Sequence, residues 1–146
     1  MIVFLVHHGD AVGPTVDLRR PLSPTGETWV EQLANSASRR GMRPAAFWHS
    51  GKLRAKQTAT IYWKVCNPLA DLQAVRGMQA GDPPGWIRDR LAGATGDVAL
   101  VGHLPHLALV RELLMGTSPD TFPAHGLVAL EEIDGRWVER WTLGSG

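Results

Sequence analysis

The N-terminal eleven residues constrain the fold of this chain more than any other stretch. Residues 1–6 are all apolar and rich in β-branched side chains, and His7, His8 and Gly9 follow directly. Six consecutive apolar residues are too many for a strand with one solvated face, so they predict a strand buried on both faces. Gly9 allows the backbone to turn sharply and to approach a ligand closely. An imidazole is therefore expected at the C-terminal edge of a central strand, where open α/β sheets bind their ligands.

Strands and helices alternate through most of the remaining chain. Ser23-Pro24 is a typical helix start, with a capping hydroxyl before a proline at the first helical position. Asp134-Gly135 is a strong hairpin signal between two apolar runs. We expect strands at residues 45–48, 72–75, 98–101, 127–133 and 137–142, and helices at 24–40, 52–66, 86–91 and 107–115. This order predicts an α/β fold with a mainly parallel central sheet and a C-terminal β-hairpin.

Composition narrows the class of protein further. With 146 residues, 44% of them hydrophobic, the chain is expected to form a single domain over residues 1–146. A chain of this size buries ~70% of its unfolded surface, enough for a core without disulfides. The net charge of +1 predicts no general attraction to nucleic acid or membranes. Cys66 is the lone cysteine, and no signal peptide is apparent, so we expect a cytoplasmic protein.

Polar side chains follow three of the predicted strands at the point where each strand ends. They are His7-His8, His49-Ser50 and Gly102-His103. The C-terminal ends of parallel strands meet at one edge of a sheet, so these groups are expected to converge there. Arg54 lies in the first turn of the helix that follows Ser50, where free N–H groups attract anions. Together His8, Arg54 and His103 suggest a phosphate held between two imidazoles and a guanidinium. The alternatives are a solvated arginine and strand-end histidines bonded to backbone.

These residues also lie within a set of short motifs that resembles the histidine phosphatase superfamily, and most closely its short bacterial SixA-type phosphohistidine phosphatases. The matching segments follow the family's order over roughly residues 1 to 110: Leu5-Val6-His7-His8-Gly9-Asp10-Ala11, Arg20-Pro21-Leu22-Ser23 with Gly26, Ser50 with Arg54-Ala55-Lys56-Gln57-Thr58-Ala59, and Val101-Gly102-His103 with Pro105. The resemblance implies a three-layer sandwich of the phosphoglycerate mutase type.

The resemblance also implies a two-step phosphatase mechanism. His8 would attack phosphorus to give a phosphohistidine enzyme, which water then hydrolyses. Arg54 and His103 would stabilise the phosphoryl oxygens, with Ser50 as a further phosphate-binding residue. Asp82 lies where larger relatives supply a proton donor, although it equally suits a turn before Pro83. The substrate would be a protein phosphohistidine or a small phosphomonoester, and no cofactor is required.

His7 departs from the family pattern, which has arginine before the nucleophile. Histidine is shorter than arginine and mostly neutral at pH 7, so it supplies a full charge only when protonated. On this reasoning activity should rise as pH falls through the titration of His7, until His8 protonates. Arg19, Arg20 or Lys52 are candidates to compensate for the missing arginine. The alternative function is a weakly active or inactive protein that binds a phosphorylated ligand.

A metal site is a further alternative, because imidazoles and carboxylates bind zinc. The candidate ligands are His7, His8, Asp10, His103 and His106. The segment His103-Leu104-Pro105-His106 contains a proline, however, and the chain has no H-E-x-x-H or cysteine ligand pattern. We therefore expect no metal.

Overall fold

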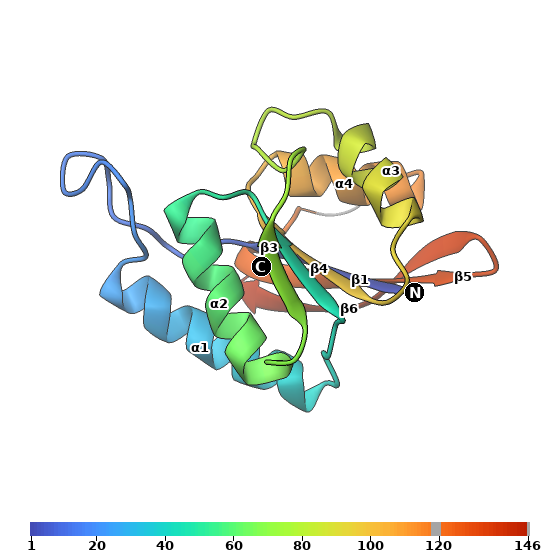
Figure 1. Ribbon diagram of the computed structural model, residues 1–146, viewed down its shortest axis with the longest axis horizontal. Helices are drawn as coiled ribbons and strands as arrows, with labels where there is room; N and C mark the ends of the chain where they lie inside the picture. Colours follow the sequence, from blue (N-terminus) through green and yellow to red (C-terminus); the bar gives the residue numbers. More distant parts are fainter. Residues whose placement is uncertain (118–120, 146) are drawn as a thin grey trace.

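A six-stranded sheet lies between two pairs of helices in the computed structural model, which describes residues 1–117 and 121–145 (Figure 1). The strands are β1 (Ile2–His7), β2 (Ala46–His49), β3 (Asp71–Ala74), β4 (Val98–Gly102), β5 (Ala124–Ile133) and β6 (Arg136–Ser145). The helices are α1 (Pro24–Arg39), α2 (Leu53–Cys66), α3 (Pro84–Ala92) and α4 (His106–Met115). Among the described residues, no helix has both the length and the apolar character needed to span a bilayer.

The strand order of the sheet is β3-β2-β4-β1-β5-β6. The strands β3, β2, β4 and β1 are mutually parallel, whereas β5 runs antiparallel to β1 and forms a hairpin with β6. The predicted mainly parallel sheet with a C-terminal hairpin is therefore confirmed. The hairpin strands are longer than expected, because pairing extends three residues further at the start of β5 and at the end of β6.

β1 is covered on both faces, as its unbroken apolar sequence predicts. Phe4 and Val6 face one core, together with Val30 of α1 and Tyr62 of α2. Val3 and Leu5 belong to a second core formed against α3 and α4. In Figure 1 the helices α1 and α2 lie on one side of the sheet, and α3 and α4 lie on the other. This arrangement is the expected three-layer sandwich.

The register of the parallel strands brings their polar ends together. His7 pairs with Gly102 across β1 and β4, and His49 pairs with Val101 across β2 and β4. The backbone N–H of His8 continues this ladder by donating to the carbonyl of Gly102 at 3.0 Å. The residues that follow β1, β2 and β4 therefore leave the sheet at the same edge.

The close approach that Gly9 permits is to α1. A Cβ atom at Gly9 would lie 2.5 Å from Cγ2 of Val30, and a Cβ atom at Gly26 would collide with the carbonyl oxygen of Asp10. The first turn of α1 therefore packs directly on the chain that follows β1, with no room for a side chain between them. This packing is a structural reason for glycine at position 9, and the close approach of Gly9 to a ligand stays a prediction.

Replacing Gly26 with alanine should therefore destabilise the protein, although alanine is the better helix former. We expect the free energy of unfolding to fall by roughly 1–3 kcal/mol, the usual cost of overpacking. Gly13→Ala is the matched control, because a Cβ atom there meets nothing within 4 Å. It should change stability by less than about 0.5 kcal/mol. Denaturant unfolding measures both values, and equal effects of the two changes would contradict this explanation.

Candidate active site

His8 lies one residue beyond β1 and is oriented by its own backbone. Its Nδ1 lies 2.7 Å from the carbonyl oxygen of Gly9. A carbonyl can only accept, so Nδ1 carries the proton and donates it, and Nε2 of the neutral ring keeps a free lone pair. The N–H of Gly9 donates to Thr58 Oγ1 at 3.0 Å, and Thr58 Oγ1 donates to the carbonyl of Arg54 at 2.8 Å. These bonds connect the chain after β1 to the first turn of α2.

His103 and Ser50 complete the side of the site formed by β2 and β4. The rings of His8 and His103 have centroids 5.1 Å apart. Ser50 Oγ lies 2.7 Å from His103 Nε2, and both residues are buried. The side chain of Gln79 donates to the carbonyl of Ser50 at 2.8 Å and holds this residue in place. The structure thus brings together two histidines and a serine that are far apart in sequence.

Two arginines supply the permanent positive charge of the site. Arg54 lies in the first turn of α2, and its Nε is buried without a hydrogen-bond partner among the described residues. Arg20 comes from the loop before α1, where its φ of 50° and a bond from its Nε to the Val12 carbonyl at 3.0 Å fix its conformation. Both guanidiniums lie close enough to His8 to lower the pKa of its imidazole. A buried, unpartnered guanidinium nitrogen beside a second arginine favours binding of an anion.

The three sheet-edge imidazoles are held in their neutral forms. Burial lowers the pKa of His7 to about 3, with further lowering by neighbouring histidines. Burial also lowers the pKa of His8 to about 4, outweighing the Gly9 hydrogen bond that raises it. The pKa of His103 is lowered to about 3, again mainly by burial. At pH 7 the rings therefore keep the lone pairs that a nucleophile requires.

These lowered pKa values predict how stability depends on pH. The unfolded chain binds protons at these histidines below about pH 6.5, whereas the folded protein binds them only near pH 3–4. Because the unfolded state binds more protons in this interval, the free energy of unfolding should decrease as pH falls from 6.5 towards 4. Denaturant titrations at several pH values measure this slope. His103→Gln should reduce the slope, and an unchanged slope in this variant would contradict the assignment.

Asp82 forms its hydrogen bonds within its own loop. Its carboxylate accepts the N–H of Gln79 at 2.9 Å, and its own N–H donates to the carbonyl of Gln79 at 3.1 Å. This geometry matches the turn interpretation of Asp82. The residue also lines a cavity of about 450 Å³ with Ser50 and Trp86. Its role as a proton donor stays a prediction.

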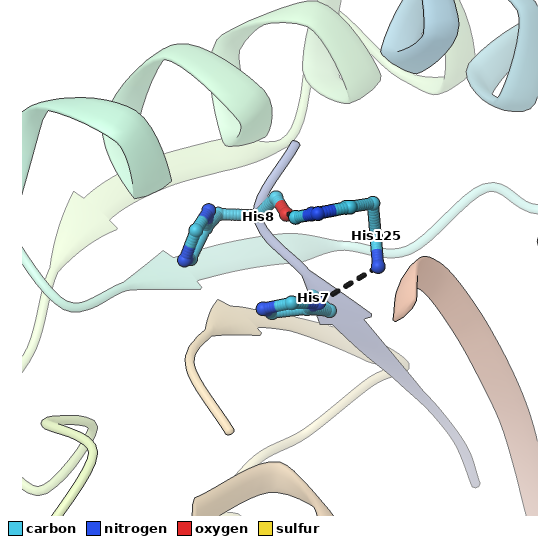
Figure 2. A group of neighbouring side chains, drawn as sticks. All are labelled: His7, His8 and His125. Atoms are coloured by element: carbon cyan, nitrogen blue, oxygen red, sulfur yellow. Dashed lines mark hydrogen bonds between the residues drawn. The ribbon is translucent and has the colours of Figure 1, made fainter. Parts of the chain in front are cut away.

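The residues proposed from sequence as a metal set do not come together as a group. His106 is fully buried in α4, and the carboxylate of Asp10 accepts a hydrogen bond from Ser23 Oγ at 2.8 Å. In the described part of the chain, the cluster whose ligand atoms lie within 4.8 Å of one another is His7, His8 and His125 (Figure 2). No sequence motif pointed to His125, since this residue lies near the start of the antiparallel strand β5, outside all the motifs.

Comparison with known proteins adds independent information on the fold. No protein-family model and no curated protein sequence matches the chain. SixA from Agrobacterium tumefaciens, described as a phosphohistidine phosphatase, superposes with a TM-score of 0.83 at 25% identity, covering 98% of this chain and 97% of that one. The protein histidine phosphatase SixA in complex with tungstate superposes with a TM-score of 0.86 at 22% identity, covering 99% and 97%. The alpha-ribazole phosphatase from Shigella flexneri gives a TM-score of 0.76 at 14% identity, covering 96% and 95%.

All three of these proteins are phosphatases by name, and their similarity extends over nearly the whole chain. The resemblance to the histidine phosphatase superfamily that the motifs indicate is confirmed at the level of the fold.

Proposed function

We propose that this protein is a phosphatase that hydrolyses its substrate through a phosphohistidine intermediate on His8. The observation that carries the proposal is the orientation of His8. Its Nδ1–H is bonded to the carbonyl of Gly9, so the lone pair on Nε2 is free, and Arg54 and His103 lie beside it. A neutral nucleophile next to a guanidinium is an arrangement that suits phosphoryl transfer.

Each step of the proposed reaction uses residues at the edge of the sheet. In the first step His8 Nε2 forms a bond to phosphorus while the bond from phosphorus to the leaving nitrogen or oxygen breaks, and the leaving group takes a proton from the solvent. In the second step a water oxygen attacks phosphorus and that water releases one proton to the solvent. The bond to His8 breaks, its electron pair returns to Nε2, and inorganic phosphate leaves. Arg54 and Arg20 stabilise the charge on the phosphoryl oxygens throughout. The reaction as proposed needs no metal and no organic cofactor.

The surroundings of the site favour a phosphohistidine on a protein over a small phosphomonoester. Figure 1 shows the segment before α1 projecting away from the body of the molecule. Two apolar side chains of this segment, Val16 and Leu18, are 76% and 87% exposed. A groove of about 790 Å³ also begins at Asp10 and His125 and runs along α1 past Trp29. An open site with apolar groups around it suits a macromolecular substrate. The imidazole of a phosphohistidine is also a good leaving group, because the pKa of a free histidine side chain is about 6.5.

Turnover of two substrate types in buffer containing a chelator tests the proposed function. One substrate is a small folded protein phosphorylated on histidine, and the other is a panel of phosphomonoesters that includes phosphoserine and a sugar phosphate. We expect dephosphorylation of the protein with a higher kcat/KM than that of any phosphomonoester. The reverse order would assign a small-molecule substrate. Binding of phosphate without turnover of either substrate would instead support the alternative that His7 suggests, a protein that only binds phosphorylated ligands.

A further inference from the structure

His125 touches both histidines at the end of β1 and does so in a costly backbone conformation. Its φ of 52° lies in the left-handed region, which only a few per cent of non-glycine residues adopt. Its backbone N–H donates to Nδ1 of His7 at 2.7 Å, and its ring Nδ1 lies 2.8 Å from the carbonyl oxygen of His8. Strained residues of this kind persist where the surrounding contacts require them, and they concentrate at functional sites.

The bond from the backbone of His125 determines which nitrogen of His7 carries a proton. A backbone N–H can only donate, so Nδ1 of His7 must accept, and the proton of the neutral ring lies on Nε2. The ring of His125 also stacks on that of His7, with centroids 4.8 Å apart and planes 10° apart. In Figure 2 the second ring nitrogen of His7 points away from His125, to the side on which the ring of His8 lies. His7 thus presents an N–H group beside the nucleophile, at a ring distance of 4.5 Å.

We propose that His125 is a positioning residue, which holds His7 as a neutral Nε2–H donor for a phosphoryl oxygen and so replaces the charged donor of the family arginine. The inference rests on the proposed function, because it concerns the same phosphoryl site. The second bond, from the ring of His125 to the carbonyl of His8, fixes the peptide that joins His8 to Gly9. The ring of His7 and the peptide after His8 are therefore both held by a single residue of β5.

A neutral His7 differs from the expectation, based on the sequence, that this residue acts through a positive charge when it is protonated. Protonation of His7 at Nδ1 would break the bond from the N–H of His125, since the same atom cannot then accept. Burial is the main cause of the low pKa of His7, and the imidazoles that face it, those of His8, His125 and His103, lower this pKa further. Activity should therefore not depend on a positive charge on His7.

A metal ion fits the same three rings less well than an anion does. Each imidazole must offer a lone pair to a metal. On His7, however, the lone pair of Nδ1 accepts the N–H of His125, and Nε2 carries the proton. Arg20 and Arg54 also lie beside His8 and repel a cation.

Nuclear magnetic resonance of the ring nitrogens tests the tautomer without any need for turnover. In protein labelled with ¹⁵N, we expect His7 to show a protonated Nε2 and an unprotonated Nδ1 from pH 8 down to about 5. A proton on Nδ1, or a cationic ring within this range, would overturn the proposal. Binding of one Zn²⁺ per protein that His7→Gln abolishes would also overturn it, because His7 would then serve as a metal ligand.

Two variants of His125 then test positioning by kinetics. Glycine and asparagine both accept the left-handed conformation, so neither His125→Gly nor His125→Asn should lower the melting temperature by more than a few degrees. His125→Gly keeps the backbone N–H but removes the ring that stacks on His7 and bonds to the His8 carbonyl. It should therefore lower kcat about 10- to 100-fold, the scale of a misplaced catalytic group. Asparagine has an amide nitrogen at the position of the histidine Nδ1 and can donate to the His8 carbonyl, so His125→Asn should recover part of this loss.

Unchanged kcat in His125→Gly, or a loss of kcat matched by a loss of folded protein, would refute the positioning role. A wild-type kcat that rises as pH falls from 8 to about 5 would show instead that His7 acts through its charge. Should the protein hydrolyse no substrate at all, the proposed function fails. The nitrogen spectrum of His7 in the wild-type protein then still decides the positioning proposal, because a proton on Nδ1 would refute it and a proton on Nε2 would support it.

Discussion

Replacing His8 with alanine is expected to abolish phosphatase turnover while leaving the affinity for phosphate largely intact. The variant loses the atom that forms the covalent bond to phosphorus, so the rate should fall by a factor on the order of 10⁴ or more. Arg54 and His103 stay in place, because neither uses the His8 side chain as a hydrogen-bond partner in the described structure. Steady-state kinetics with phosphohistidine protein, together with calorimetric titration of vanadate, measure the two quantities.

The separation of turnover from binding is what distinguishes a nucleophile from a ligand-binding histidine. His103→Ala is the matched comparison, because this imidazole lies beside His8 but is bonded to Ser50. We expect His103→Ala to lower the rate by about 10²–10³-fold, as loss of a donor to the transition state does, rather than to abolish it. Substantial residual turnover in His8→Ala would mean that another group attacks phosphorus.

Replacing Arg54 with alanine is expected to have the largest effect on anion binding. Its Nε is buried with no partner among the described residues, and the guanidinium stands at the N-terminal turn of α2. Loss of a charged hydrogen bond should weaken vanadate or phosphate binding by ~1.5–3 kcal/mol. The rate should fall as well, because the same oxygens carry charge in the transition state. Calorimetric titration of the anion into wild-type and variant protein measures the loss.

Arg54→Lys separates charge from geometry at this position. Lysine keeps the positive charge but lacks the planar fork, so we expect an intermediate affinity. The pKa of His8 gives a second measurement of the charge at position 54. Burial is the largest cause of the low pKa of His8, and Arg54 lowers it further, so Arg54→Ala should raise this pKa above its value of about 4 while Arg54→Lys should not. Equal anion affinity in wild-type and Arg54→Ala protein would show that the anion binds elsewhere.

The features predicted best from sequence are those that local patterns determine. The apolar run before His7 predicted a strand buried on both faces, and Phe4 and Leu5 do face opposite cores. Asp134-Gly135 predicted the hairpin between β5 and β6. Polar residues after three parallel strands predicted that these side chains converge at one edge of the sheet, and His8, Ser50 and His103 do lie together there. Each of these predictions needs only side-chain periodicity or turn chemistry, both of which are local in sequence.

The features that the sequence did not predict depend on contacts between distant segments. His125 reaches His7 because β5 pairs antiparallel with β1, and a turn in the left-handed region directs its N–H back to that ring. The sequence offered Arg20 only as one of three candidates to compensate for the missing arginine, and the conformation of its loop is what brings it near His8. For Asp82 the sequence left two roles open, and the hydrogen bond to Gln79 matches the turn role. No spacing rule in a single sequence encodes these contacts, since they arise from tertiary packing.

Trapping the covalent intermediate tests the central claim about His8 most directly. The enzyme is mixed with excess phosphohistidine protein, stopped within one turnover by denaturant at alkaline pH, and digested for mass spectrometry. We expect the N-terminal peptide that contains His8 to carry one phosphoryl group, and the label to decay with the rate constant of the second step on a longer incubation. His8→Ala should carry none. An unlabelled N-terminal peptide from an enzyme that releases phosphate in a burst, or a phosphoryl group found on His103, would contradict the assignment of His8 as the nucleophile.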